Sequence, residues 1–334
     1  MKKPLLLHYY ITNACNAKCE FCDIWKQSEK TNAKLEDVEQ NLIAGRKLGA
    51  KFVDFTGGEP LLNQNLPEFL KIAKNLGFIT SITTNALLFE KYAEKLAGKG
   101  DSRPSVDLLH FSIDGTREIN DKIHGVKTFD AVMKSIEIAK KHKLYPDLLF
   151  TYTDENIDCV PEIQKIAVKN KLILILDPVF STDGTPPRSD ETNEKAKKFA
   201  KLPAVYLNSA HLILRKNGGN KTENPICKAV DGAIVILPDN SLALPCYHHS
   251  KEKLKIENNL ELLRKSENVA EFQKLQGKFD FCENCHINCY MDPSFQYLRG
   301  IIPNSLFFAS NFSKFKYAFW KYFVFRQKLP FAKF

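Results

Sequence analysis

The sequence contains no apolar run long enough to cross a bilayer and no low-complexity tract. Its first residues, Met-Lys-Lys, are not followed by the apolar stretch and small-residue cleavage site of a secretory signal, so we expect no signal peptide. Without an export signal, the nine cysteines are expected to be reduced thiols and metal ligands, and not a disulfide framework. These absences together predict a cytoplasmic protein.

The composition is that of an ordinary globular protein, with 44% hydrophobic and 26% charged residues. The net charge of +9 is spread too widely along the 334 residues to indicate nucleic acid, and no nucleic-acid partner is expected. A chain of this length has room for one large domain and a small one.

Apolar runs typical of strands alternate with helical periodicity through the first two hundred residues. Six β/α repeats with short loops predict an α/β fold in which a parallel sheet curls into an open, partial (β/α)6 barrel of the TIM kind. In such a barrel the chemistry lies at the carboxyl ends of the strands. The expected strands cover residues 5–11, 52–55, 78–83, 108–113, 148–153 and 172–176.

The pattern changes after about residue 180. A turn-rich stretch at 182–187 precedes a polar helix, and Gly218-Gly219-Asn220 is expected to be a linker. A hairpin pattern follows, with strands at 233–237 and 242–244. We therefore expect a partial barrel over residues 1–200, a small cysteine-rich α+β extension over 220–295, and a tail over 304–334.

Three cysteines, Cys15, Cys19 and Cys22, lie in the run Cys-Asn-Ala-Lys-Cys-Glu-Phe-Cys directly after the first expected strand. Thiolates this close on one loop can converge on a single inorganic centre. Three thiolates are one short of the four irons of a [4Fe–4S] cluster, so one iron would stay open to a substrate or cofactor. The alternative is a structural zinc site with a ligand from elsewhere, but such sites are usually built from paired cysteines or histidines. The spacing favours the cluster.

Three further segments, 56–60, 83–85 and 112–115, also end expected strands. Together with the cysteine loop they resemble the radical S-adenosylmethionine (SAM) superfamily, whose signature is Cys-x3-Cys-x-aromatic-Cys, here with Phe21 as the aromatic residue. Gly57-Gly58-Glu59-Pro60 is similar to the family's motif for the SAM amino group. The resemblance covers roughly residues 5–180 by pattern. It implies a [4Fe–4S] cluster on Cys15, Cys19 and Cys22 whose fourth iron is chelated by SAM.

The resemblance also implies which residues contact SAM. Gly57 and Gly58 lack side chains and permit close approach to the amino group, and Glu59 adds negative charge. Asn85, Ser112 and Asp114 offer polar groups for the ribose hydroxyls and the carboxylate, although Ser112 and Asp114 equally suit a capped turn before a helix. Phe21 either stacks near the adenine or packs in the ordinary way.

One departure from the family pattern concerns the partner of the SAM carboxylate. Similar proteins often carry an arginine after the Ser-x-Asp-Gly turn, where this chain reads Asp-Lys-Ile-His-Gly over residues 121–125. His124 is the candidate for that place. A neutral histidine binds a carboxylate more weakly than a guanidinium, so a protonated His124, Lys122 or Lys127 are the alternatives.

A second group of cysteines resembles the SPASM or twitch extension of the superfamily, which holds auxiliary [4Fe–4S] clusters. Five cysteines suit one auxiliary cluster, and a zinc ribbon is the alternative. Cys159 is expected to be a small buried residue. His248 and His249, beside Cys246, are candidates for facing the substrate, although histidine pairs in loops are usually solvated. The candidate ligands are Cys227, Cys246, Cys282 and Cys285, with Cys289 as a competing ligand.

The zone from Asn304 onward has no acidic residue, and aromatic residues recur in it at helical spacing. A basic, aromatic, amphipathic helix over 311–334 fits an interfacial membrane contact. The alternative is a helix docked on the barrel with its aromatics as core. The residues concerned are Phe312, Phe315, Phe319, Trp320, Tyr322 and Phe323, with Lys314, Lys316, Lys321, Arg326, Lys328 and Lys333.

The resemblance implies an enzyme that cleaves SAM reductively to methionine and a 5′-deoxyadenosyl radical, which abstracts hydrogen from a substrate. We expect a small-molecule substrate that is hydrophobic, such as a lipid or isoprenoid, and reduced flavodoxin or ferredoxin as the electron donor. A peptide-modifying maturase is the main rival, although a barrel that begins near Leu5 is expected to leave no room for a preceding peptide-recognition domain. A non-catalytic iron–sulfur electron carrier or scaffold needs no SAM motif.

Overall fold

The computed structural model of the chain describes residues 2–98, 104–180, 189–257, 259–299 and 305–327. Its centre is a ten-stranded open sheet in the order β10-β9-β8-β1-β2-β3-β4-β5-β6-β7. Neighbours from β8 to β7 are parallel, whereas β9 and β10 are antiparallel. The strands are β1 (Leu6–Thr12), β2 (Phe52–Gly57), β3 (Ile79–Thr84), β4 (Leu108–Ser112), β5 (Asp147–Tyr152), β6 (Leu174–Pro178), β7 (Val205–Leu207), β8 (Ala233–Ile236), β9 (Ser241–Leu244) and β10 (Glu252–Lys255).

The predicted α/β partial barrel is confirmed, and the six expected strands are each observed with ends shifted by no more than two residues. Two features were not predicted. β7 has only three residues, which is too short for periodicity to reveal. β8, expected only as one arm of a hairpin, pairs in parallel with β1 and extends the barrel sheet. The extension that we expected over 220–295 therefore shares its sheet with the barrel, and the domain boundaries stay a prediction.

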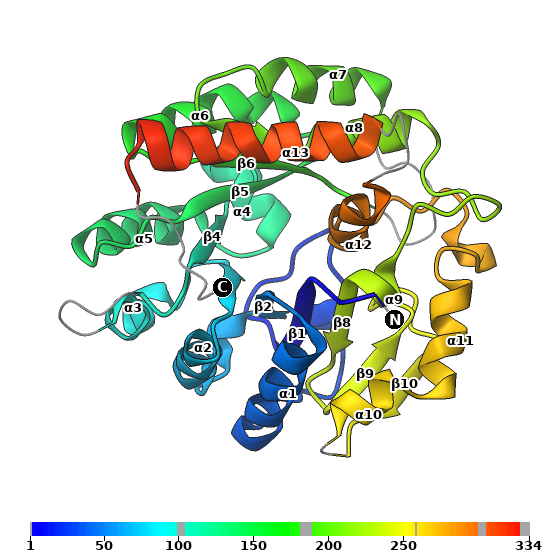
Figure 1. Ribbon diagram of the computed structural model, residues 1–334. Helices are drawn as coiled ribbons and strands as arrows, with labels where there is room; N and C mark the ends of the chain where they lie inside the picture. The colour runs from blue at the N-terminus through cyan, green and yellow to red at the C-terminus, as the bar shows by residue number, and fades with distance from the viewer. Residues whose placement is uncertain (1, 99–103, 181–188, 258, 300–304, 328–334) are drawn as a thin grey trace.

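Helices that follow the strands cover the outer face of the sheet (Figure 1). Alternate residues of β1, such as Leu7 and Tyr9, are fully buried in the main core against these helices, because successive side chains of a strand point to opposite faces. His8 and Tyr10 face the other, concave side. The helices are α1 (Leu35–Leu48), α2 (Leu66–Asn75), α3 (Phe89–Ala97), α4 (Arg117–His124), α5 (Phe129–Lys141) and α6 (Val160–Lys169).

Of the later helices, α7, α10 and α11 contribute to the main core, whereas α8, α12 and α13 form a second core on the other side of the sheet. α8, α12 and α13 contact one another, and Figure 1 shows α13 lying across β5 and β6. Tyr317 of α13 donates its hydroxyl to Asp147 at 2.5 Å, so α13 docks on the face of β5 that carries Asp147 and Thr151. These helices are α7 (Asp190–Phe199), α8 (Ser209–Lys216), α9 (Ala229–Gly232), α10 (Leu260–Arg264), α11 (Glu267–Leu275), α12 (Asn288–Phe295) and α13 (Ser305–Ala318), which continues as a π-helix over Phe319–Val324.

The tail helix docks on the barrel through its polar side. Ser310 and Ser313 are buried and hydrogen-bond to Asn208 and Ser209 at the start of α8. The alternative of a docked helix is observed, but most of its aromatics do not form core, because five phenylalanines form an outward stripe: Phe308, Phe312, Phe315, Phe319 and Phe323, each 46–80% exposed. Lys328 and Lys333 lie outside the described residues. None of the described helices is both long enough and apolar enough to span a membrane.

Candidate active site

The three amino-terminal cysteines lie on the loop after β1 as free, partly exposed thiols. The carboxyl end of α4 holds this loop: the backbone N–H groups of Lys18 and Glu20 donate to the carbonyls of His124 and Ile123 at 2.9 and 3.0 Å. Gly125 permits the contact, since a Cβ at its φ of +64° would lie 2.9 Å from the Lys18 oxygen. The sequence pattern did not reveal this role of α4.

Gly57 and Gly58 bring the end of β2 against the cysteine loop. The Gly58 N–H donates to the Thr12 carbonyl at 2.9 Å, and the Glu59 N–H donates to the Ala14 carbonyl at 2.8 Å. A Cβ on Gly57 or Gly58 would lie 1.9 or 2.0 Å from those same carbonyl oxygens. The glycines are therefore required by the chain's own packing. Their predicted approach to the SAM amino group stays a prediction.

The Glu59 carboxylate is buried and links the end of β2 to the end of β3 by hydrogen bonds. One oxygen accepts hydrogen bonds from Thr84 Oγ1 at 2.7 Å and the Leu61 N–H at 3.0 Å, and the other accepts from the Asn85 N–H at 2.9 Å. Burial nevertheless raises the pKa of Glu59. The Asn85 amide donates to Asn16 Oδ1 on the cysteine loop at 2.8 Å. The predicted residues at the ends of β2 and β3 thus meet the cysteine loop.

Asp114 and His124 form a buried pair next to the cysteine loop. Asp114 accepts from the Thr151 N–H at 2.6 Å and contacts His124 Nε2 at 2.9 Å. His124 Nδ1 lies 3.8 Å from Cys19 Sγ. Burial lowers the pKa of His124, but the hydrogen bonds to Asp114 and Cys19 outweigh burial and raise it to about 10.

This arrangement bears on the roles predicted for these residues. Both ring nitrogens of His124 face protein groups, so its contact with a SAM carboxylate stays a prediction that requires one of them to change partner. Lys122, an alternative, pairs with Glu155 at 3.0 Å. Ser112 is the last residue of β4. Asp114 does not cap α4, because the N-cap residue of that helix is Thr116 and no side chain caps its first N–H groups.

The cysteine loop fits a group that needs several thiolates. Burial and the nearby Glu59, Cys19 and Cys22 raise the pKa of Cys15 to about 11, so bare thiolates would repel one another without a cationic centre. His124 can donate a hydrogen bond to the Cys19 sulfur, which is a common way to tune such a centre. Across the described residues, no three Cys, His, Asp or Glu side chains are arranged to hold a single metal ion. The donor set of soft thiolates suits an iron–sulfur cluster.

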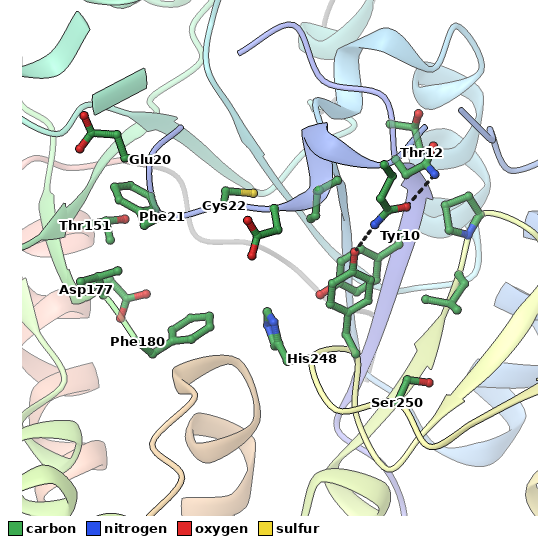
Figure 2. Close-up of a pocket in the computed structure, with 18 of the residues that line it drawn as sticks. Tyr10, Thr12, Glu20, Phe21, Cys22, Thr151, Asp177, Phe180, His248 and Ser250 are labelled. Atoms are coloured by element: carbon green, nitrogen blue, oxygen red, sulfur yellow. Dashed lines mark hydrogen bonds between the residues drawn. The ribbon is translucent and has the colours of Figure 1, made fainter. Parts of the chain in front are cut away.

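A cavity of about 1500 Å³ opens beside this loop on the concave face of the barrel. Phe21 and Cys22 line it, and Phe21 is the one predicted SAM contact among its lining residues. Figure 2 shows Asp177 and Phe180, from the end of β6, on the same side of the cavity as Phe21. His248, from the loop after β9, lies beside Phe180 and packs edge-on against it, with 5.0 Å between the ring centroids.

Four of the carboxyl-terminal cysteines, Cys227, Cys246, Cys282 and Cys285, line one small buried pocket. Burial raises the pKa of each thiol, and their mutual repulsion adds to the shift of the first three. Cys289 is not among the residues that line this pocket; burial, Asp177 and Asp54 raise its pKa to about 12. His249 also lines the pocket and stacks on Phe281 at 4.8 Å.

Asn220 organises the cysteine pocket, although its sequence context suggested only a linker. Its side chain accepts from the Cys227 N–H at 3.0 Å and donates to the Cys282 carbonyl at 3.0 Å. Its N–H donates to the Cys285 carbonyl at 2.8 Å. A buried polar residue after two glycines was the available signal. Cys159, by contrast, packs in the main hydrophobic core as predicted.

Comparison with known proteins places these features in a family. Residues 9–167 match the Radical SAM superfamily. The chain is 30% identical over 178 residues to the Fe-coproporphyrin III synthase of Methanosarcina barkeri, and the match covers 51% of this chain and 42% of that protein. It is 29% identical over 297 residues to a probable GTP 3′,8-cyclase of Sulfurisphaera tokodaii, covering 79% of this chain and 91% of that protein. The chain thus spans less than half of the first relative and most of the second.

Solved structures share the fold at low identity. SuiB of Streptococcus suis bound to precursor peptide SuiA superposes with a TM-score of 0.67 at 19% identity, over 92% of this chain and 76% of that chain. anSMEcpe with bound AdoMet and the Kp18Cys peptide superposes with a TM-score of 0.63 at 19% identity, over 95% and 97%. Residues 9–167 of the chain form a radical SAM domain, and enzymes of that superfamily use SAM and a [4Fe–4S] cluster.

Proposed function

We propose that Cys15, Cys19 and Cys22 hold the SAM-binding cluster and that the adjoining cavity of about 1500 Å³ receives the substrate. One observation carries this proposal. The cysteine loop is hydrogen-bonded through its backbone to the Gly-Gly-Glu turn, at the carboxyl ends of the parallel strands. When bound, the cluster and SAM supply a carbon-centred radical that abstracts hydrogen from the substrate. The chain's own residues would bind and orient SAM and the substrate and shield them from solvent.

The orientation of the cysteine loop would depend on His124 and Asp114. His124 would hold the Cys19 thiolate by a hydrogen bond, and Asp114 would hold His124 in place. Glu59 keeps a buried carboxylate beside the loop, where an ammonium group of SAM would be favoured. Phe21 and Cys22 belong to the cysteine loop and also line the cavity, so the cluster site would border the substrate site directly.

The walls of the cavity support a substrate with an apolar body, as a lipid or isoprenoid has. Tyr10 and Tyr247 stack at 3.9 Å with an interplanar angle of 6° and line one side. Ile24, Phe180 and Leu237 add apolar surface. We expect the electron for SAM cleavage to come from reduced flavodoxin or ferredoxin.

Anaerobic reconstitution tests this function. Reduced, iron-loaded protein is mixed with SAM, and 5′-deoxyadenosine is measured by mass spectrometry. We expect Cys19→Ala to abolish 5′-deoxyadenosine, whereas Cys159→Ala, a matched cysteine change in the hydrophobic core, should retain it. Reconstituted protein that makes no 5′-deoxyadenosine would falsify the proposal.

We further propose that Cys227, Cys246, Cys282 and Cys285 hold an auxiliary [4Fe–4S] cluster. Their common pocket supports this set over one that includes Cys289. Iron analysis distinguishes the two: Cys246→Ala should lose about one cluster's iron, whereas Cys289→Ala should keep it. A zinc ribbon would instead retain stoichiometric zinc after anaerobic purification.

The phenylalanine stripe on α13 supports a peripheral membrane contact. Exposed aromatic side chains insert at the boundary between headgroups and acyl chains. The lysines of the helix contribute less than expected, because Lys314 pairs with Asp292 and Lys321 with Asp147. Contact would therefore depend on apolar insertion more than on anionic lipid. Changing Phe312 and Phe315 to serine should reduce binding to phosphatidylcholine vesicles, and unchanged flotation would reject the contact.

A further inference from the structure

The charge of the cavity is opposite to the charge of the protein. The chain has a formal net charge of +9. The residues that line the cavity nevertheless include seven carboxylates and, within the described part of the chain, one cationic side chain, that of Lys253. Such a cavity with low-dielectric walls repels anions and concentrates cations.

Some of this negative charge is already balanced. Three of the carboxylates pair with lysines that do not line the cavity: Asp23 with Lys26 at 2.7 Å, Glu155 with Lys122 at 3.0 Å, and Asp239 with Lys255 at 2.8 Å. Asp154 accepts hydrogen bonds from Ser189 and Thr192 at the start of α7. Two more of the seven carboxylates, those of Glu20 and Glu29, belong to exposed lining residues.

Asp177 is the least exposed of the seven carboxylates, because it is partly buried whereas the other six are exposed. It follows Leu176 at the carboxyl end of β6, paired in register with Thr151 of β5, and both side chains line the cavity. One of its oxygens accepts from Asn288 Nδ2 at 2.8 Å. The Arg215 guanidinium donates to Asn288 Oδ1 at 3.0 Å, so Asn288 lies between Arg215 and Asp177, and within the described residues no cation pairs directly with Asp177.

The raised pKa of Asp177 agrees with the absence of a direct ion pair. Burial raises its pKa to about 7 despite the opposing effect of Arg215, and Asp292 raises it further. A cation bound against its free oxygen would favour the ionised form. Phe21 and Phe180 lie around the same part of the cavity, where aromatic faces can also attract a cation (Figure 2).

We propose that the substrate carries a protonated amine on an apolar body and that Asp177 binds this amine. This inference rests on the proposed function, because it treats the cavity as the substrate site. SAM itself does not account for the charge: of the residues predicted to contact SAM, the cavity lining includes Phe21 alone. A nucleoside triphosphate such as GTP, named for the Sulfurisphaera tokodaii relative, brings several negative charges into this cavity and is disfavoured.

The test compares two small probes with the same apolar body and opposite charge, 4-phenylbutylamine and 4-phenylbutyrate. Each is titrated calorimetrically into reconstituted, SAM-bound protein under anaerobic conditions. We expect the amine to bind at least about tenfold more tightly than the acid, as one charge-assisted hydrogen bond implies. Asp177→Asn, which keeps an oxygen for Asn288, should remove most of this preference. Glu94→Gln, an equal charge change on the exposed face of α3, should leave it intact.

Equal binding of the two probes, tighter binding of the acid or of GTP, or a full preference in Asp177→Asn would each overturn the proposal. If Asp177→Asn does not fold, the preference of the parent protein and its loss at high salt decide the question. SAM cleavage is measured in the same samples. Protein that prefers the amine but makes no 5′-deoxyadenosine would refute the proposed function alone.

Discussion

Replacing Lys321 with methionine tests how the tail is held on the barrel. Lys321 Nζ lies 2.6 Å from Asp147 Oδ2, and both side chains are almost fully buried, at 4% and 0% exposed. The same carboxylate oxygen accepts from Tyr317 at 2.5 Å and lies 3.9 Å from His110 Nε2. Asp147 Oδ1 has no hydrogen-bond partner among the described residues. Lys321 is therefore the main compensation for a buried charge.

Removing one partner of such a pair leaves an uncompensated charge and costs about 3–5 kcal/mol. Urea denaturation followed by tryptophan fluorescence measures the loss, since one of the two tryptophans, Trp320, lies next to Lys321. Lys314→Met is the control: its pair with Asp292 is partly exposed, 38% and 39%, and should contribute below about 1 kcal/mol. Adding Asp147→Asn to Lys321→Met should recover much of the loss. If the two lysine variants lose the same stability, the argument from buried charge is wrong.

Three further changes address the site. Gly58→Ala should displace the cysteine loop and abolish 5′-deoxyadenosine formation, because its Cβ would lie 2.0 Å from a loop carbonyl oxygen, whereas Gly45→Ala in α1, with its nearest neighbour at 3.4 Å, should leave activity intact. Cys246→Ala should retain some SAM cleavage, in contrast to Cys19→Ala, and equal loss in both would reject separate roles for the two cysteine groups. Because the folded-state pKa of Asp177 is raised from 3.8 to about 7, its contribution to stability is present below pH 4 and lost as the pH rises through 7. Asp177→Asn should therefore unfold less readily than the parent by up to about 4 kcal/mol at pH 8 and show no gain at pH 4, as denaturation at the two pH values would reveal.

The strands could be predicted because each buries one or both faces and leaves a periodic record in the sequence. Phe78–Thr83 and Leu148–Thr153 were expected within one residue of β3 and β5. β7 was missed because Val205–Leu207 is shorter than one period of any helical pattern and barely longer than one of a strand. The pairing of β8 with β1 joins residues more than two hundred positions apart, and local patterns carry no information about such partners.

The candidate site also contains residues that the sequence could identify and contacts that it could not. Cys15, Cys19 and Cys22 could be recognised from spacing, since three thiolates on one loop have few other uses. The contacts of His124 with Asp114 and Cys19, and of Asn220 with the second cysteine group, could not, because each depends on side chains brought together from distant strands and loops.

The tail helix shows most directly what the sequence determines and what the tertiary structure decides. By itself, the sequence determined that a helix with aromatic and basic residues would form there, because helical periodicity is local. Only the tertiary structure decided which side of that helix faces the protein. The buried carboxylate of Asp147 binds Lys321, and the partly exposed carboxylate of Asp292 binds Lys314, so the polar side docks and the phenylalanines face outward. The same holds for the cavity: the carboxylates that surround it are scattered from Glu20 to Asp239 among many lysines, and folding gathers them onto one surface because parallel strands end at one edge.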